Sequence, residues 1–221
     1  MKQYDVFIFD ADNTLYDYDM AEAAALRAML GSCRIEYSED IRARYREICK
    51  EDAEITRFSR FLAELGVSAI NVRDFNDYFL KLLSSKSYLI DGALKICRDI
   101  TAAGGRIYIA TSGGAAAQAR LAAGAVQKYI SDVFIAEKIG FDMLHPEFFE
   151  HIFNQIQPAA KDKILMIGDN LALDIACGNN VGIDTCWLNR FGEKNTSGIV
   201  PTYEIRRLRQ LADAIPKGGR A

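Results

Sequence analysis

Hydrophobic and polar residues follow one another along most of this chain in a way that predicts strands followed by helices. Five short apolar runs, each followed by polar residues or glycine, predict buried strands. These strands cover residues 4–9, 106–110, 132–135, 163–167 and 184–188. Apolar residues spaced three and four apart predict helices at residues 93–103, 115–123, 146–155, 173–178 and 203–214, with a short strand or loop before the last. This alternation predicts a parallel sheet covered by helices on both faces.

The stretch from Met20 to Leu83 interrupts the alternation, because its apolar residues have helical spacing only. It contains no convincing strand, and it follows directly after the first one. We therefore expect an α/β protein with a Rossmann-like, doubly wound parallel sheet and an inserted helical cap. The expected catalytic core covers residues 1–16 and 88–221, and the expected cap covers residues 17–87.

Composition and charge narrow the classes of function. The 221 residues are half hydrophobic and carry a formal net charge of -3, with acidic and basic residues interspersed. No basic stripe favours binding to a nucleic acid polymer. Five widely spaced cysteines without a CxxC motif argue against a disulfide framework or zinc site. No secretory signal or membrane-spanning run is visible. We expect a cytoplasmic monomer or homodimer that binds no membrane.

Polar residues follow three of the predicted strands at the edge where ligands bind in parallel sheets. The three segments are Asp10-Ala11-Asp12-Asn13-Thr14, Thr111-Ser112-Gly113, and Gly168-Asp169 with Asp174 about one helical turn further on. Each segment alone is also compatible with a turn or a helix cap. Their occurrence in this order, each after a strand, favours one shared site. Carboxylates gathered at one edge would repel each other, and Mg²⁺ would relieve that repulsion.

These side-chain types suit phosphoryl transfer. An aspartate can attack phosphorus to form an aspartyl-phosphate, which water then hydrolyses. A second carboxylate two residues on can protonate the leaving oxygen and later deprotonate the water. The hydroxyl and backbone N–H groups of Thr111, Ser112 and Gly113 can hold phosphate oxygens, with help from the start of the following helix.

The same motifs resemble those of the haloacid dehalogenase-like (HAD) hydrolase superfamily across nearly the whole chain. Phe9-Asp10-Ala11-Asp12-Asn13-Thr14-Leu15 resembles its first motif, Thr111-Ser112-Gly113 its second, and the segment from Gly168 to Asp174 its fourth. The segment Cys186-Trp187-Leu188-Asn189-Arg190 resembles the members related to pyrimidine 5′-nucleotidases.

The resemblance implies a role for each residue. Asp10 would be the nucleophile and a metal ligand, and Asp12 the general acid/base that binds metal through its backbone carbonyl. Asp169 would complete the protein ligands, and Asp174 would lie behind these ligands or close to that position. The implied activity is Mg²⁺-dependent hydrolysis of a small phosphorylated metabolite, a phosphomonoester such as a nucleotide or sugar phosphate. A dehalogenase on the same fold is an alternative, although Asp12 argues against it because carbon–halogen cleavage needs no acid.

One family feature is missing from this sequence. The third motif normally has a lysine followed by proline, and here Met143 and Leu144 occupy those positions. Lys138 or His145 could substitute for the lysine, although a surface position is the favoured interpretation of both residues. Loss of a charged contact to phosphate costs on the order of 2–4 kcal/mol of transition-state stabilisation. A further alternative is therefore a phosphatase-like binding or regulatory protein with low or no activity.

Overall fold

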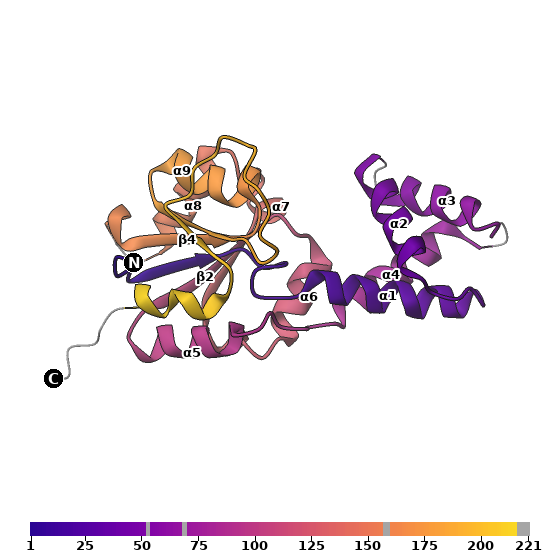
Figure 1. Ribbon diagram of the computed structural model, residues 1–221, viewed down its shortest axis with the longest axis horizontal. Helices are drawn as coiled ribbons and strands as arrows, with labels where there is room; N and C mark the ends of the chain where they lie inside the picture. The colour runs from indigo at the N-terminus through magenta and orange to yellow at the C-terminus, as the bar shows by residue number, and fades with distance from the viewer. Residues whose placement is uncertain (52–53, 68–69, 157–159, 216–221) are drawn as a thin grey trace. The chain divides into compact units, whose positions relative to one another are not determined.

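The computed structural model describes residues 1–51, 54–67, 70–156 and 160–215. The chain forms two compact units. One consists of Met1–Asp17 together with Ser87–Ala221, and the other consists of Tyr18–Lys86. We call them the core unit and the helical unit. Figure 1 shows the strands in the core unit and the helices α1 to α4 in the helical unit.

Within the described residues, six parallel strands form one sheet in the order β3-β2-β1-β4-β5-β6. The strands are β1 (Val6–Phe9), β2 (Arg106–Thr111), β3 (Ile130–Ile135), β4 (Ile164–Gly168), β5 (Asp184–Leu188) and β6 (Tyr203–Ile205). The chain adds β2 and β3 on one side of β1, and then crosses to β4 on the other side. Ligands of doubly wound sheets bind where the strand order reverses in this way, at the carboxyl ends of the strands. In this protein that position is the end of β1 and β4.

Helices cover both faces of the sheet, which confirms the expected fold class. Figure 1 shows α5 on one face and α8 and α9 on the other. The helical segments of the core unit are α5 (Ala93–Ala102), α6 (Ala115–Ala123), η1 (Gln127–Tyr129), α7 (Ala136–Ile139), α8 (Pro146–Gln155), η2 (Lys161–Lys163), η3 (Leu171–Ile175), α9 (Ala176–Val181) and η4 (Leu208–Ala214).

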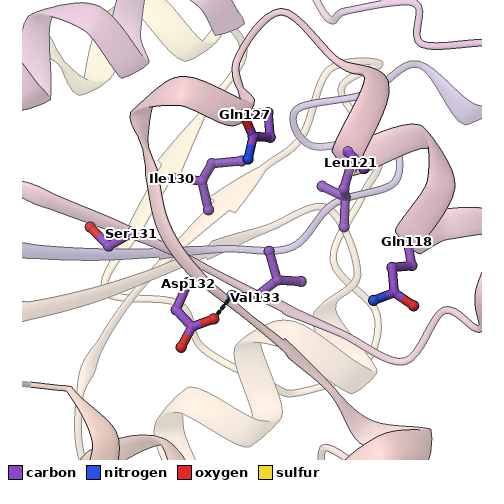
Figure 2. Close-up of a pocket in the computed structure, with 8 residues that line it drawn as sticks. Gln118, Leu121, Gln127, Ile130, Ser131, Asp132 and Val133 are labelled. Carbon is purple, nitrogen blue, oxygen red and sulfur yellow. Dashed lines mark hydrogen bonds between the residues drawn. The ribbon is translucent and has the colours of Figure 1, made fainter.

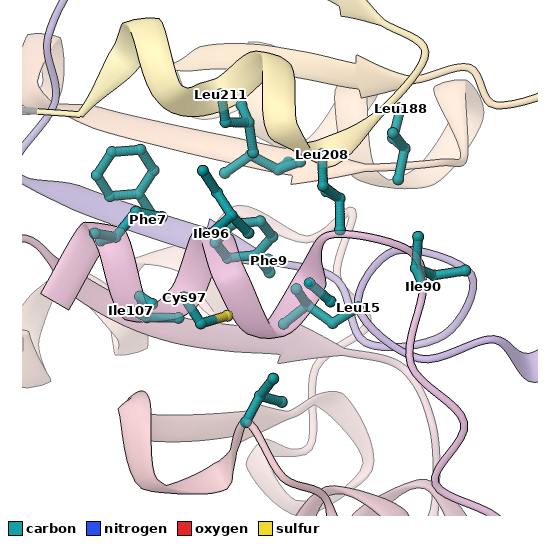
Figure 3. Close-up of a cluster of buried hydrophobic side chains, with 14 of the residues drawn as sticks. Phe7, Phe9, Leu15, Ile90, Ile96, Cys97, Ile107, Leu188, Leu208 and Leu211 are labelled. Atoms are coloured by element: carbon teal, nitrogen blue, oxygen red, sulfur yellow. The ribbon is translucent and has the colours of Figure 1, made fainter.

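Alternate residues of β1 supply two separate hydrophobic cores, because successive side chains of a strand point to opposite faces. Phe7 and Phe9 pack with α5 and η4, where Figure 3 shows them beside Ile96 and Leu208. Val6 and Ile8 belong to the core on the other face, which also includes α8. Four consecutive buried residues in β1 thus hold the following residue, Asp10, at a fixed position at the sheet edge.

Two local predictions in the core unit were wrong. Residues 203–214 form the strand β6 and the 3₁₀ helix η4 rather than one helix, because Tyr203–Ile205 pairs with β5. Residues 173–178 do not form one short helix. A π-helical turn, η3, comes first, and α9 continues from it to Val181.

The helical unit has a core of its own. Its helices are α1 (Tyr18–Ser32), α2 (Glu39–Glu51), α3 (Glu54–Glu64) and α4 (Val72–Ser84). Aromatic rings fill the centre, and the ring centroids of Tyr45 and Phe58 are 5.6 Å apart. The carboxylate of buried Glu22 accepts a hydrogen bond of 2.7 Å from Nε of Arg46. In the described part of the chain, no helix has the length and hydrophobicity needed to span a membrane.

Candidate active site

Asp10 follows β1 directly, and the surrounding loop holds it in place. Its N–H donates to the carbonyl of Ile167 at 2.8 Å, which continues the pairing of β1 with β4. The Thr14 hydroxyl donates to Asp10 Oδ2 at 3.4 Å. Asn13 has a φ of 59°, a left-handed conformation that asparagine tolerates better than most residues. This turn folds the chain back, so that the N–H of Tyr16 reaches the carbonyl of Ala11 at 2.9 Å.

Three carboxylates meet at this edge of the sheet. One oxygen each from Asp10, Asp169 and Asp174 lie within 4.8 Å of one another. Desolvation, followed by the negative charges of Asp174 and Asp169, raises the pKa of Asp10 well above its ordinary value. Burial also raises the pKa of Asp174 to about 7. We call these three residues the carboxylate cluster.

The backbone around Asp174 explains why this carboxylate joins the cluster. A Cβ atom on Gly168 would lie 2.1 Å from Asp174 Oδ2, so only glycine leaves room for the side chain. The Asn170 side chain accepts from the N–H groups of Ala172 and Leu173, and this cap starts the π-helical turn η3. The N–H of Asn170 donates to Asp174 Oδ2 at 3.0 Å. The resemblance placed Asp174 behind the ligands or close to that position, and the structure brings one of its oxygens within 4.8 Å of those of Asp10 and Asp169.

The carboxylate cluster suits a hard divalent cation. Asp174 Oδ1 is buried and has no hydrogen-bond partner among the described residues, which is costly without a compensating group. Burial and the neighbouring negative charges raise the pKa values of Asp10 and Asp174, and a bound cation would offset that charge. Carboxylate oxygens are the ligands that Mg²⁺ takes in proteins. The residues present therefore fit such an ion.

Asp12 lies outside the carboxylate cluster and pairs with an arginine that the sequence analysis missed. Nη2 of Arg120, in α6, lies 2.8 Å from Asp12 Oδ1 and 2.5 Å from Asp12 Oδ2. The Arg120 side chain is 3% exposed, whereas that of Asp12 is 28% exposed. The helix pattern contains a signal for this arginine, because the apolar residues Ala117 and Leu121 are four apart in α6 and Arg120, three residues after Ala117, lies on the same side of the helix.

The predicted phosphate-binding segment begins with Thr111, the last residue of β2, which is the neighbour of β1 in the sheet. Thr111 is buried, and its Oγ1 accepts the N–H of Gly113 at 3.2 Å. A Cβ atom on Gly113 would lie 2.6 Å from that of Ala117, so the turn into α6 requires glycine. The side chain of Ser112 is exposed. Thr111 therefore reaches the same sheet edge as Asp10, and the first turn of α6 follows.

The third-motif segment places no lysine at the expected position. Met143 is 1% exposed and packs in the hydrophobic core with Phe148 and Phe149. The two candidate substitutes, Lys138 and His145, are both exposed. Nδ1 of His145 lies 3.8 Å from a carboxylate oxygen of Glu147, on the surface.

A second residue that the sequence analysis missed holds the backbone of Asp169. The indole N–H of Trp187, in β5, donates to the carbonyl of Asp169 at 2.8 Å. Trp187 is buried, and its register beside Gly168 brings the indole to the start of the turn that carries Asp169. A tryptophan late in a predicted strand two residues before a polar segment gave only a weak hint of this contact.

Comparison with known proteins identifies the class. Residues 4–182 match the family model described as haloacid dehalogenase-like hydrolase. The chain belongs to this family, and it is a hydrolase with a Rossmann-like core. All three motifs described above fall within the matched residues, including the carboxylate cluster and Thr111.

Relatives of known name match this chain over almost its whole length and over almost all of their own. The HAD-hydrolase YfnB of Bacillus subtilis is 32% identical over 96% of this chain and 95% of its own. The pyrimidine 5′-nucleotidase PynA of Streptococcus pneumoniae is 32% identical over 97% and 96%. The pyrimidine 5′-nucleotidase YjjG of Escherichia coli is 25% identical over 97% and 99%. The crystal structure of YfnB, which is bound to magnesium, superposes with a TM-score of 0.88 over 97% of this chain and 99% of that one.

Proposed function

We propose that this protein is a Mg²⁺-dependent phosphatase that hydrolyses a small phosphomonoester, with Asp10 as the nucleophile. The carboxylate cluster carries the proposal, because it brings three carboxylates together at the reversal point of the sheet, two of them buried. Among the described residues, Asp174 Oδ1 has no hydrogen-bond partner. Asp12, two residues beyond Asp10, supplies the separate carboxylate that phosphoester hydrolysis needs as an acid and base. The magnesium-bound structure of YfnB supports the choice of metal.

The residues of this chain would act in two steps. Asp10 attacks phosphorus, the bond to the leaving oxygen breaks, and Asp12 gives that oxygen a proton. Asp12 then takes a proton from water, whose oxygen attacks the aspartyl-phosphate and releases inorganic phosphate and free Asp10. Thr111 and the N–H groups that follow hold the phosphoryl oxygens. Asp10, Asp169 and the Asp12 carbonyl would hold Mg²⁺ with Asp174 beside them, and the bound ion would offset negative charge during the reaction.

Pyrimidine nucleoside 5′-monophosphates are the first substrates to test, because PynA and YjjG are named as nucleotidases for these compounds. Sugar phosphates are the second class. A suitable panel contains uridine and thymidine 5′-monophosphates, purine counterparts, several hexose phosphates and 4-nitrophenyl phosphate. Release of phosphate is measured with Mg²⁺ and with EDTA.

The control variant is Asp10→Asn, which keeps the size of the side chain and removes the nucleophile. We expect turnover only with Mg²⁺, and a loss of at least about a thousandfold in Asp10→Asn. Hydrolysis that persists in EDTA or in this variant would refute the proposed mechanism. Asp184→Asn changes an aspartate of β5 outside the carboxylate cluster and should leave turnover close to that of the wild type.

The burial of Met143 favours a second candidate, a phosphatase-like protein that binds phosphate compounds and turns over slowly. A methionine in the apolar core offers phosphate no charge. Binding of phosphate or of Mg²⁺ without turnover across the panel would support this candidate. Met143→Lys separates the two, because a rise of tenfold or more in kcat would show that activity is limited by the missing cation. Thermal stability is measured alongside, since an ammonium group among Phe148 and Phe149 is costly.

A further inference from the structure

Arg120 is one of the least exposed charged residues in the described chain, and its position requires an explanation. Only 3% of its side-chain surface is exposed. Removing a guanidinium from water is energetically costly unless an opposite charge and hydrogen bonds compensate. Asp12 is the carboxylate that lies within hydrogen-bond distance of it, through both oxygens. The pair therefore joins a buried cation of α6 to the loop that follows β1.

A second contact holds the same loop against the same helix. The Tyr16 hydroxyl donates to the carbonyl of Leu121, next to Arg120, at 3.4 Å. A Cβ atom on Gly124 would lie 2.1 Å from that hydroxyl oxygen, so the close approach depends on glycine. Asp12 and Tyr16 also form a β-bridge with each other. Both ends of the loop segment from Asp12 to Tyr16 are thus fixed to one short stretch of α6.

The hydrogen-bonding capacity of Asp12 is compatible with chemistry during this contact. A carboxylate offers about four lone-pair sites, two on each oxygen. Nη2 of Arg120 uses one site on each oxygen, and the side chain of Asp12 remains 28% exposed. One lone pair on each oxygen therefore remains available, so a leaving oxygen or a water could exchange a proton with Asp12 while Arg120 holds it.

We propose that Arg120 is a positioning residue that aims the Asp12 carboxylate at the leaving-group oxygen. This inference rests on the proposed phosphatase function. Arg120 binds no substrate in this role and acts only through Asp12. Free rotation of the Asp12 side chain would otherwise spread its oxygens over several rotamers, and a misplacement of about 1 Å can reduce a rate about a hundredfold.

The test uses the chemistry of the leaving group. A nucleoside or alkyl phosphomonoester releases an alkoxide that needs a proton, whereas 4-nitrophenyl phosphate releases a stable phenolate that needs almost none. In Arg120→Met, kcat/KM should fall about 10- to 100-fold for the alkyl ester and less than about threefold for the aryl ester. The value of kcat/KM is suitable because it reports the step in which the leaving group departs.

Two further variants separate positioning from a structural role. Arg120→Ala should regain kcat/KM for the alkyl ester when millimolar guanidinium is added, and Arg120→Lys should be intermediate between wild type and Arg120→Met. The control is Gln118→Met on the same helix. Figure 2 shows Gln118 in a pocket formed with β3, and this variant should behave as the wild type. If Arg120→Met does not fold, the ratio of the two substrates in Arg120→Lys decides.

The outcomes distinguish this inference from the function on which it rests. The proposed function would be overturned if the wild type hydrolysed neither ester. It would also be overturned if hydrolysis persisted after loss of Asp10. The role of Arg120 would be overturned, and the proposed function kept, if the wild type hydrolysed both esters but Arg120→Met lost kcat/KM equally on both and guanidinium did not rescue Arg120→Ala. Unchanged kcat/KM in Arg120→Met would overturn it as well.

Discussion

Replacing Asp174 with asparagine tests whether the carboxylate cluster is built for a cation or for the stability of the fold. The amide has the same shape as the carboxylate, so it still fits over Gly168. Its oxygen can keep accepting the N–H of Asn170. Its NH₂ group then takes the place of the buried oxygen that has no partner, and it faces the remaining carboxylates as a donor. Asp174→Asn should therefore stabilise the protein without metal and weaken its binding of metal.

The magnitude follows from the spacing of the charges. Two unit charges 4.8 Å apart repel by about 3–4 kcal/mol at an effective dielectric constant of 20. Protonation relieves part of this repulsion near neutral pH, because the pKa of Asp174 is raised to about 7. At pH 8 without metal we expect the free energy of unfolding of Asp174→Asn to exceed that of the wild type by about 1–3 kcal/mol, or about 3–8 °C in Tm.

The same raised pKa sets the sign of the pH dependence. Between the ordinary value of 3.8 and the folded value of about 7, the folded state binds more protons than the unfolded state. Stability contributed by this carboxyl is therefore present at low pH and is lost as the pH rises through that window. The wild type in EDTA should become less stable between pH 5 and pH 8, and Asp174→Asn should show a shallower decline.

Thermal unfolding followed by calorimetry, in EDTA and in a Mg²⁺ series, measures both effects. Mg²⁺ at a hundred times its Kd should stabilise the wild type by about 2.7 kcal/mol, and the same concentration should stabilise the variant less. The control is Asp184→Asn. An asparagine oxygen at position 184 can still accept from the Tyr4 hydroxyl, which lies 2.7 Å from Asp184 Oδ2, so this variant should change stability little and keep the Mg²⁺ effect. A lower Tm for Asp174→Asn than for the wild type in EDTA at pH 8 would refute the reasoning.

Two further substitutions test the residues that hold the cluster in place. Gly168→Ala puts a methyl group where Asp174 Oδ2 lies. We therefore expect its affinity for Mg²⁺, measured by titration calorimetry, to be at least about tenfold weaker than that of the wild type. An unchanged affinity would show that the close contact is unimportant. Trp187→Phe removes the donor to the Asp169 carbonyl and leaves a smaller ring. The free energy of unfolding, measured by urea titration, should therefore fall by about 2–4 kcal/mol. A loss below about 0.5 kcal/mol would contradict this role of Trp187.

Local sequence pattern could predict the parts of the fold that are determined by buried strands. The apolar run before Asp10 and the run before Asp169 form β1 and β4, and both aspartates follow these strands directly. Residues 203–214 could not be assigned in the same way, because apolar residues spaced by two, three and four positions fit a strand and a helix equally. Pairing with β5, which is distant in sequence, decides that Tyr203–Ile205 is a strand.

The contacts that complete the candidate site are harder to predict, because they join segments far apart in sequence. Arg120 and Asp12 are separated by 108 positions, and an arginine in an alanine-rich helix usually lies on the surface. The place of Asp174 depends on the π-helical turn η3, whose geometry differs from that of the α-helix that periodicity predicts. For Met143, the mismatch with the family motif was visible in the sequence, but the burial of its side chain in the core was not.

The contact between Trp187 and Asp169 also gives the protein an internal optical reporter. Trp187 is the only tryptophan among the 221 residues, so the tryptophan fluorescence of the whole chain comes from one indole. That indole is 3% exposed and donates its N–H to the backbone of a residue in the carboxylate cluster. Any cation or phosphate compound that shifts this carbonyl should change the emission. Binding at the site can therefore be followed in the unlabelled protein, even for compounds that it does not hydrolyse.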